Sequence, residues 1–187
     1  MTLWLDAIPN VLRARAAAAL KEGDWLGFLC TASNHDGLWL VYMNVAALKQ
    51  HGVYEPALLA ALTASRVKNR HMDIAPWCIS FARQTARSCG LLGSPLPAAA
   101  PFTVYRGVAY NTDLEERKRA EEALRTLDPA RARWFPARWD LPKLAVWSGR
   151  ILESDVLAYV NGRREQEIIA LPDTVQNLRQ TRSSDIV

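Results

Sequence analysis

The sequence predicts an α+β protein in which helices come first and short strands follow. Residues 1–100 contain several helix-forming stretches, whereas residues 101–175 contain short runs of β-prone side chains. The two kinds of element do not alternate as they do in βαβ units, and such segregation is typical of α+β folds. A hydrophobic content of 50% and a charged content of 22% over 187 residues are ordinary globular values.

Helices are expected throughout the first part of the chain. They are predicted over residues 8–22, 24–31, 56–70 and 74–86, with a turn at 34–37 and a run at 38–44 that periodicity leaves open between strand and helix. Pro9 suits the first turn of the first helix, and Gly23 is a typical stop just past its end. The Gly- and Pro-rich stretch 90–100 then predicts a linker.

Short strands are expected after this linker. They are predicted over residues 102–108, 144–147, 151–152 and 167–171, with a helix over 113–127, a turn or short edge at 155–159 and a frayed polar tail over 176–187. Ser148 and Gly149 are expected to interrupt a strand. Because about 85 C-terminal residues alone would make a thin core, we expect one domain, 1–187, in which the helical part covers the strand-rich part.

Composition narrows the functional classes. The net charge of +4 suits an anionic ligand such as a dinucleotide without demanding nucleic acid. No apolar run reaches the roughly 18 residues of a membrane helix, and the N-terminus lacks the pattern of a signal peptide. We therefore expect a cytoplasmic protein without membrane partners, unless it leaves the cell by a non-classical route.

Several common site types have no signal in the sequence. Three scattered cysteines, Cys30, Cys78 and Cys89, form neither a disulfide framework nor a zinc pattern and are expected to be buried thiols. The three histidines are far apart, so no metal site is predicted. Glycine-rich phosphate loops of the Rossmann and P-loop types are absent from the sequence.

Two carboxylates mark the strongest candidate site. Glu165 and Glu167 are two residues apart, just before an apolar, β-prone run, and Gly162 supplies a turn ahead of them. On an extended strand this spacing points both side chains to one face. Such a pair suits a cleft, where one acid holds a substrate hydroxyl and the other handles a proton or a nucleophile. The alternative is an exposed patch in which Arg163 and Arg164 pair with the two acids.

A second candidate is the strand that carries Arg106, followed by Gly107. An arginine at this position can bind a phosphate with its planar guanidinium, or it can hold the strand to a neighbouring loop.

The order of these two motifs resembles the arginine-type mono-ADP-ribosyltransferases, a toxin-like family with an R-S-E signature. Tyr-Arg-Gly at 105–107 is similar to the first motif of that family, and the run 156–169, Val-Leu-Ala-Tyr-Val-Asn-Gly-Arg-Arg-Glu-Gln-Glu-Ile-Ile, is similar to its last. The resemblance covers residues 101–175. It implies a helical cap packed on two small antiparallel sheets, with nicotinamide adenine dinucleotide (NAD) held as co-substrate in the cleft between them.

The resemblance also implies roles for individual residues. Glu167 would grip the 2′-hydroxyl of the nicotinamide ribose and stabilise its positive charge in an oxocarbenium-like transition state. Glu165 would orient or deprotonate the acceptor, expected to be a protein arginine because a guanidinium docks well between two carboxylates. Arg106, with Gly107, would hold the pyrophosphate or organise the loop that does.

The middle motif is matched in part by residues 124–135. Thr126, Trp134 and Phe135 fall in register with NAD-binding positions of the family, and Asp128 is also in place. Leu124 and Arg125 depart from the family's Ser-x-Ser or Ser-x-Thr pattern. The departure at Leu124 is expected to remove a hydroxyl that supports the catalytic glutamate.

Two other readings stay open. Because the middle motif is eroded, the chain could be a degenerate member of the fold that binds NAD or a partner without turnover. Alternatively, Trp134, Phe135 and Trp139 alternate with arginines over residues 131–139, a pattern typical of nucleic-acid surfaces. If these rings instead pack in the core, the arginines between them are simply solvated.

Overall fold

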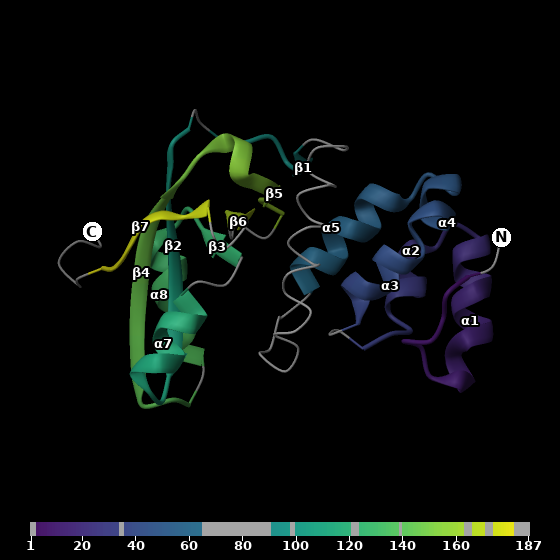
Figure 1. Ribbon diagram of the computed structural model, residues 1–187, viewed down its shortest axis with the longest axis horizontal. Helices are drawn as coiled ribbons and strands as arrows, with labels where there is room; N and C mark the ends of the chain where they lie inside the picture. The colour runs from purple at the N-terminus through teal and green to yellow at the C-terminus, as the bar shows by residue number, and fades with distance from the viewer. Residues whose placement is uncertain are drawn as a thin grey trace. The chain divides into compact units, whose positions relative to one another are not determined.

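A computed structural model describes residues 3–33, 36–64, 91–97, 100–120, 124–138, 140–162, 166–170 and 174–181. The chain divides into two compact units, Met1–Cys89 and Gly90–Val187. Figure 1 draws the described part of the first unit in purple and blue and that of the second in teal, green and yellow. The helix expected over 74–86 and the end of the one expected over 56–70 lie outside the described residues.

The described part of the first unit is helical. Its elements are α1 (Asn10–Lys21), α2 (Trp25–Leu29), α3 (Gly37–Met43), α4 (Val45–Gln50) and α5 (Tyr54–Ala64). As predicted, α1 ends just before Gly23, whose φ of 77° is the left-handed conformation that glycine tolerates. The open run at 38–44 proves to be helix α3.

Apolar side chains and one buried amide hold this unit together. Phe28, Leu40 and Leu58 are buried in its interior. Asn44 is also buried, and its side chain exchanges hydrogen bonds of 2.8–2.9 Å with the backbone N–H and C=O of Trp4. The expectation of buried thiols is wrong for Cys30, which is the C-cap residue of α2 and is exposed. Cys78 and Cys89 lie outside the described residues.

The described part of the second unit contains a seven-stranded mixed sheet. Its strands are β1 (Leu92–Gly93), β2 (Phe102–Tyr110), β3 (Leu124–Thr126), β4 (Lys143–Ile151), β5 (Val156–Val160), β6 (Glu167–Ala170) and β7 (Gln176–Gln180), in the order β1-β5-β6-β3-β2-β4-β7. Only β1 and β5 run parallel within the described sheet. The helices of this unit are α7 (Asp113–Ala120), α8 (Pro129–Trp134) and the 3-10 turns η2 (Pro136–Arg138) and η3 (Glu153–Asp155).

The α+β class is confirmed, but the expectation of two small antiparallel sheets is wrong. All seven described strands belong to one sheet, and the β1–β5 pair makes it mixed. The physical reason is a narrow junction: β2 and β3 are joined at a single register pair, Tyr105 with Thr126. This pair connects a half made of β2, β4 and β7 to a half made of β1, β5, β6 and β3.

Four predicted elements differ in the structure. The helix expected over 113–127 ends at Ala120, and residues 124–126 form β3. Strand β4 runs unbroken through Ser148 and Gly149. The segment expected to be a turn or edge is β5, which lies between β1 and β6. Residues 176–180, expected to be frayed, form β7 and pair with β4.

The two faces of this sheet are covered by different helices. One face carries a core cluster that includes Phe102, Val104 and Ile168. Trp147 lies toward the other end of the same face and contacts α7. On the opposite face, α8 packs against β2 at Gly107. The second face also carries the residues at positions 103 and 105, because side chains alternate along a strand.

Candidate functional site

Polar side chains form a row across the face of the sheet that α8 partly covers. The register pairs Glu167 with Thr126, Thr126 with Tyr105, Tyr105 with Ser148 and Ser148 with Arg179. These five residues come from the neighbouring strands β6, β3, β2, β4 and β7, and residues directly opposite one another share a face. We call this set the polar row.

The polar row has opposite charges at its two ends. Glu167 is half-buried at one end, and Arg179 is exposed at the other. Four strand spacings of about 4.8 Å separate them, so their backbones are about 19 Å apart. Thr126 and Ser148, between them, are both buried. The row therefore carries a carboxylate at one end and a guanidinium at the other, and its buried middle residues are shielded from solvent.

Thr126 is the hydroxyl residue opposite Glu167. Its Oγ1 accepts a hydrogen bond of 3.1 Å from the backbone N–H of Asp128. Leu124, in contrast, pairs with Ile169, two positions beyond Glu167. The departure at Leu124 therefore does not fall on the position that faces the glutamate, and a hydroxyl is retained there by Thr126.

Arg106 lies on the other face of the sheet. It follows Tyr105 directly and is therefore on the opposite side from Thr126. Its Nε donates a hydrogen bond of 2.6 Å to the carbonyl of Arg119, and Nη1 of Arg125 donates one of 2.9 Å to the carbonyl of Ala120. Two guanidiniums thus meet the last carbonyls of α7, where positive charge is favourable.

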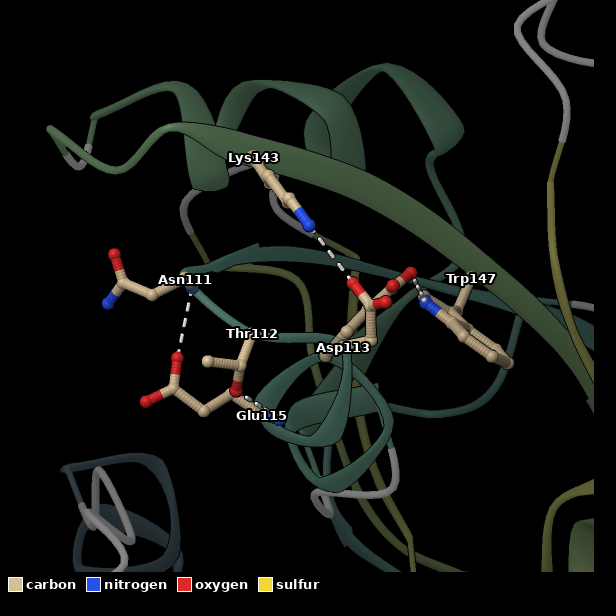
Figure 2. Close-up of polar contacts among 7 residues, drawn as sticks. Asn111, Thr112, Asp113, Glu115, Lys143 and Trp147 are labelled. Atoms are coloured by element: carbon tan, nitrogen blue, oxygen red, sulfur yellow. Dashed lines mark hydrogen bonds and ion pairs between the residues drawn. The ribbon is translucent and has the colours of Figure 1, made fainter.

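Helix α7 is also fixed at its beginning, as Figure 2 shows. Glu115 accepts a hydrogen bond of 2.9 Å from the backbone N–H of Asn111, and its own N–H donates one of 3.3 Å to Oγ1 of Thr112. The bond from Asn111 is the main reason why the pKa of Glu115 is lowered. Lys143 pairs with Asp113 at 3.1 Å, and this hydrogen bond raises the pKa of Lys143.

Two further residues tie α7 to the sheet. Trp147 Nε1 donates a hydrogen bond of 2.9 Å to Oε1 of Glu116. The pKa of Tyr110 is raised, mainly by burial and to a smaller extent by a hydrogen bond with Glu116. Arg106 is therefore one of several side chains that connect α7 to the sheet.

Gly107 allows α8 to approach β2 closely. A Cβ atom at this position would lie 1.6 Å from the carbonyl oxygen of Ala132 and 2.5 Å from Cδ of Pro136. Helix α8 begins at an N-cap, Asp128, whose Oδ1 accepts hydrogen bonds from the N–H groups of Ala130 and Arg131. Gly107, to which the family resemblance gave a role in cofactor binding, thus has a packing role here.

The end of α8 carries an exposed aromatic cluster. Trp134 is 45% exposed, which contradicts the alternative in which this ring packs in the core. It meets the ring of Phe135 edge-on, with centroids 5.5 Å apart. The guanidinium of Arg138 lies 4.4 Å from the Trp134 centroid and 4.9 Å from that of Phe135, a cation–π arrangement. Trp139 lies outside the described residues.

A pocket adjoins the arginine end of the polar row. It has a volume of about 570 Å³ and is lined by Thr103, Ser148, Gly149, Arg150, Asn177, Leu178 and Arg179. Most of these residues could not be recognised from sequence, because 148–149 were predicted to interrupt a strand and 176–187 to be a frayed tail. Alternation along the predicted strand 102–108 could have placed Thr103 and Tyr105 on one face with Gly107.

Glu165 lies outside the described residues, so only one acid of the Glu-x-Glu motif is seen. Among the residues that the structure describes, no group of His, Cys, Asp and Glu side chains could hold a metal ion. In the same part of the chain, every helix is too short or too polar to cross a membrane.

Comparisons with protein-family models, curated proteins and solved structures found no match for this chain.

Proposed function

We propose that this protein is an NAD-dependent mono-ADP-ribosyltransferase that moves ADP-ribose from NAD to an acceptor, a protein arginine being the first candidate. The register pair of Thr126 with Glu167 carries the proposal. These two residues come from separate motifs of the family resemblance, 41 positions apart in sequence (167 minus 126), and they meet on neighbouring strands.

In this proposal Glu167 acts on the nicotinamide ribose. Its carboxylate accepts a hydrogen bond from the 2′-hydroxyl and stabilises the positive charge that develops as the bond from C1′ to nicotinamide breaks. The electron pair of that bond leaves with nicotinamide. A guanidinium nitrogen of the acceptor then bonds to C1′ and loses one proton to a base, the role that the resemblance gives to Glu165.

Thr126 and Arg106 have supporting roles in the proposal. Thr126, buried opposite Glu167, limits the room available to the carboxylate and offers it a hydroxyl neighbour. Arg106 organises the end of α7 through the carbonyl of Arg119. Of the two roles that the resemblance allowed for Arg106, organising a neighbouring segment is the one that its contact favours.

Nicotinamide release from NAD tests the proposal. Wild-type protein should release nicotinamide, and agmatine, a small guanidine acceptor, should accelerate the release. Glu167→Gln keeps the size of the side chain and should reduce release at least about a hundredfold. Glu153→Gln, an exposed substitution in η3, is the matched control and should leave the rate unchanged. Full release by Glu167→Gln would contradict the assignment.

An inactive fold that binds NAD without turnover is the second candidate. It is favoured by the position of Arg106, which lies across the sheet from Glu167 and contacts α7. Calorimetry with NAD separates the two candidates. Heat of binding without any nicotinamide release would favour the inactive fold, whereas release that requires Glu167 would exclude it.

A further inference from the structure

The residues that line the pocket at the β7 edge of the sheet have no role yet in the reaction proposed above. Among the described residues, its lining contributes two guanidiniums, two hydroxyls and one carboxamide, and no carboxylate. Its volume of about 570 Å³ falls within the range of small-molecule sites. We call it the edge pocket. Its chemistry suits an anion that can accept several hydrogen bonds.

A β-bulge shapes the edge pocket. Between two register pairs, β4 advances from Ser148 to Arg150 while β7 covers the three steps from Arg179 to Gln176. The extra residue lies in the stretch that contains Asn177, whose φ of 52° is left-handed. A bulge bends its strand and redirects side chains, and bulges are frequent next to functional sites.

Gly149 lets the bulged strand come close to β4. A Cβ atom at this position would lie 2.4 Å from Cγ1 of Val175 and 3.1 Å from the carbonyl oxygen of Gln176. The edge pocket therefore depends on a glycine in one strand and on a left-handed asparagine in the other.

The positive charges of the two arginines in the edge pocket are accessible to a ligand. Arg150 and Arg179 come from adjacent strands and are exposed. Within the described residues, neither guanidinium has a carboxylate partner. Two like charges on neighbouring strands repel each other, and a bound anion with two negative oxygens relieves this repulsion while accepting charge-assisted hydrogen bonds.

We infer that the edge pocket binds a phosphate of an adenine nucleotide through Arg150 and Arg179. The identification of that nucleotide as NAD rests on the proposed function. Ser148, which lines the pocket, is three strand spacings, about 14 Å, from Glu167 in the register of the sheet. That separation favours the adenosine-side phosphate, because Glu167 would contact the nicotinamide ribose at the other end of the dinucleotide.

Calorimetric titration of the full-length protein with ADP-ribose tests this inference. ADP-ribose carries both phosphates and is not turned over, because nicotinamide is already absent. Each of Arg150→Gln and Arg179→Gln should weaken binding about tenfold, and the double variant at least about thirtyfold. Arg133→Gln, which removes an exposed arginine of α8 outside the pocket, is the matched control and should bind like the wild type. Thermal unfolding verifies that each variant is folded.

The outcomes separate this inference from the proposed function. Unchanged affinity for ADP-ribose in a folded double variant overturns the inference, even if wild-type protein releases nicotinamide. An equal loss in Arg133→Gln also overturns it, because binding would then follow overall charge. Arginine-dependent binding without any nicotinamide release supports the inference while the transferase proposal fails. Tighter binding of a single-stranded oligonucleotide through the same two arginines overturns the nucleotide assignment in favour of nucleic acid.

Discussion

Replacement of Gly107 by alanine tests how α8 is held on the sheet. The new Cβ atom would lie 1.6 Å from the carbonyl oxygen of Ala132, and ordinary contact begins at 3.4 Å. The helix backbone would therefore have to move by about 1.8 Å. A side chain could rotate away from such a clash, but a backbone carbonyl inside a helix moves only with the helix.

The expected loss of stability follows from two opposing effects. Overpacking of a core typically lowers the free energy of unfolding by about 1–3 kcal/mol. Because the clash here is with a backbone atom, we expect a loss near the upper end of that range, about 3 kcal/mol. Alanine is better than glycine inside a strand by about 0.5–1 kcal/mol, because less conformational entropy is lost on folding. The net loss is then about 2 kcal/mol, which corresponds to a fall of roughly 10 °C in Tm for a unit of about 100 residues.

Urea titration followed by far-UV circular dichroism, together with thermal unfolding, measures this loss. Gly162→Ala is the matched control, because a Cβ atom there would meet no atom of the described residues within 4 Å. A Gly107→Ala protein within about 0.5 kcal/mol of the wild type would refute the packing argument. If that variant were stable but bound NAD poorly, Gly107 would instead act through the ligand, as the sequence motif predicted.

Two other predictions concern the helix termini of the second unit. Asp128→Ala should lower the free energy of unfolding by about 1 kcal/mol, because it removes the side chain that caps α8. Asp128→Asn should retain most of this stabilisation, because asparagine also caps helices well. Urea midpoints of the two variants give the comparison. The pKa of Glu115 is lowered from its ordinary value of 4.5, so its stabilisation is present above that value and is lost as pH falls through the folded-state pKa. Glu115→Gln should therefore show a smaller loss of stability on acidification than the wild type, and parallel curves would disprove this.

Sequence order was sufficient to predict the fold class, because long-range packing was not needed to recognise helices followed by strands. Short elements were harder. The three residues of β3 are too few to display a period of two, so they merged with the helical pattern before them. Strand β4 was divided in the prediction because Ser148 and Gly149 are typical of turns, whereas Gly149 serves the approach of the neighbouring strand.

The candidate site was predictable only where residues lay in recognisable motifs. Thr126 and Glu167 were named from sequence, and their pairing in the sheet came from the structure. Ser148 and Arg179 could not have been found, because their contribution depends on which strands are neighbours, and 176–180 had been assigned to the tail. Arg106, in contrast, was easy to name from its motif, but its side chain contacts the last turn of α7 and not the polar row.

The polarity of β7 has a consequence for the behaviour of the protein in concentrated solution. At the outer ends of the described sheet are β1, which is two residues long, and β7, whose exposed residues include Gln176, Asn177 and Arg179. Long, flat and apolar edge strands invite pairing with other chains, and short, charged or bulged ones discourage it. The same irregularity that forms the edge pocket therefore also protects the sheet against aggregation.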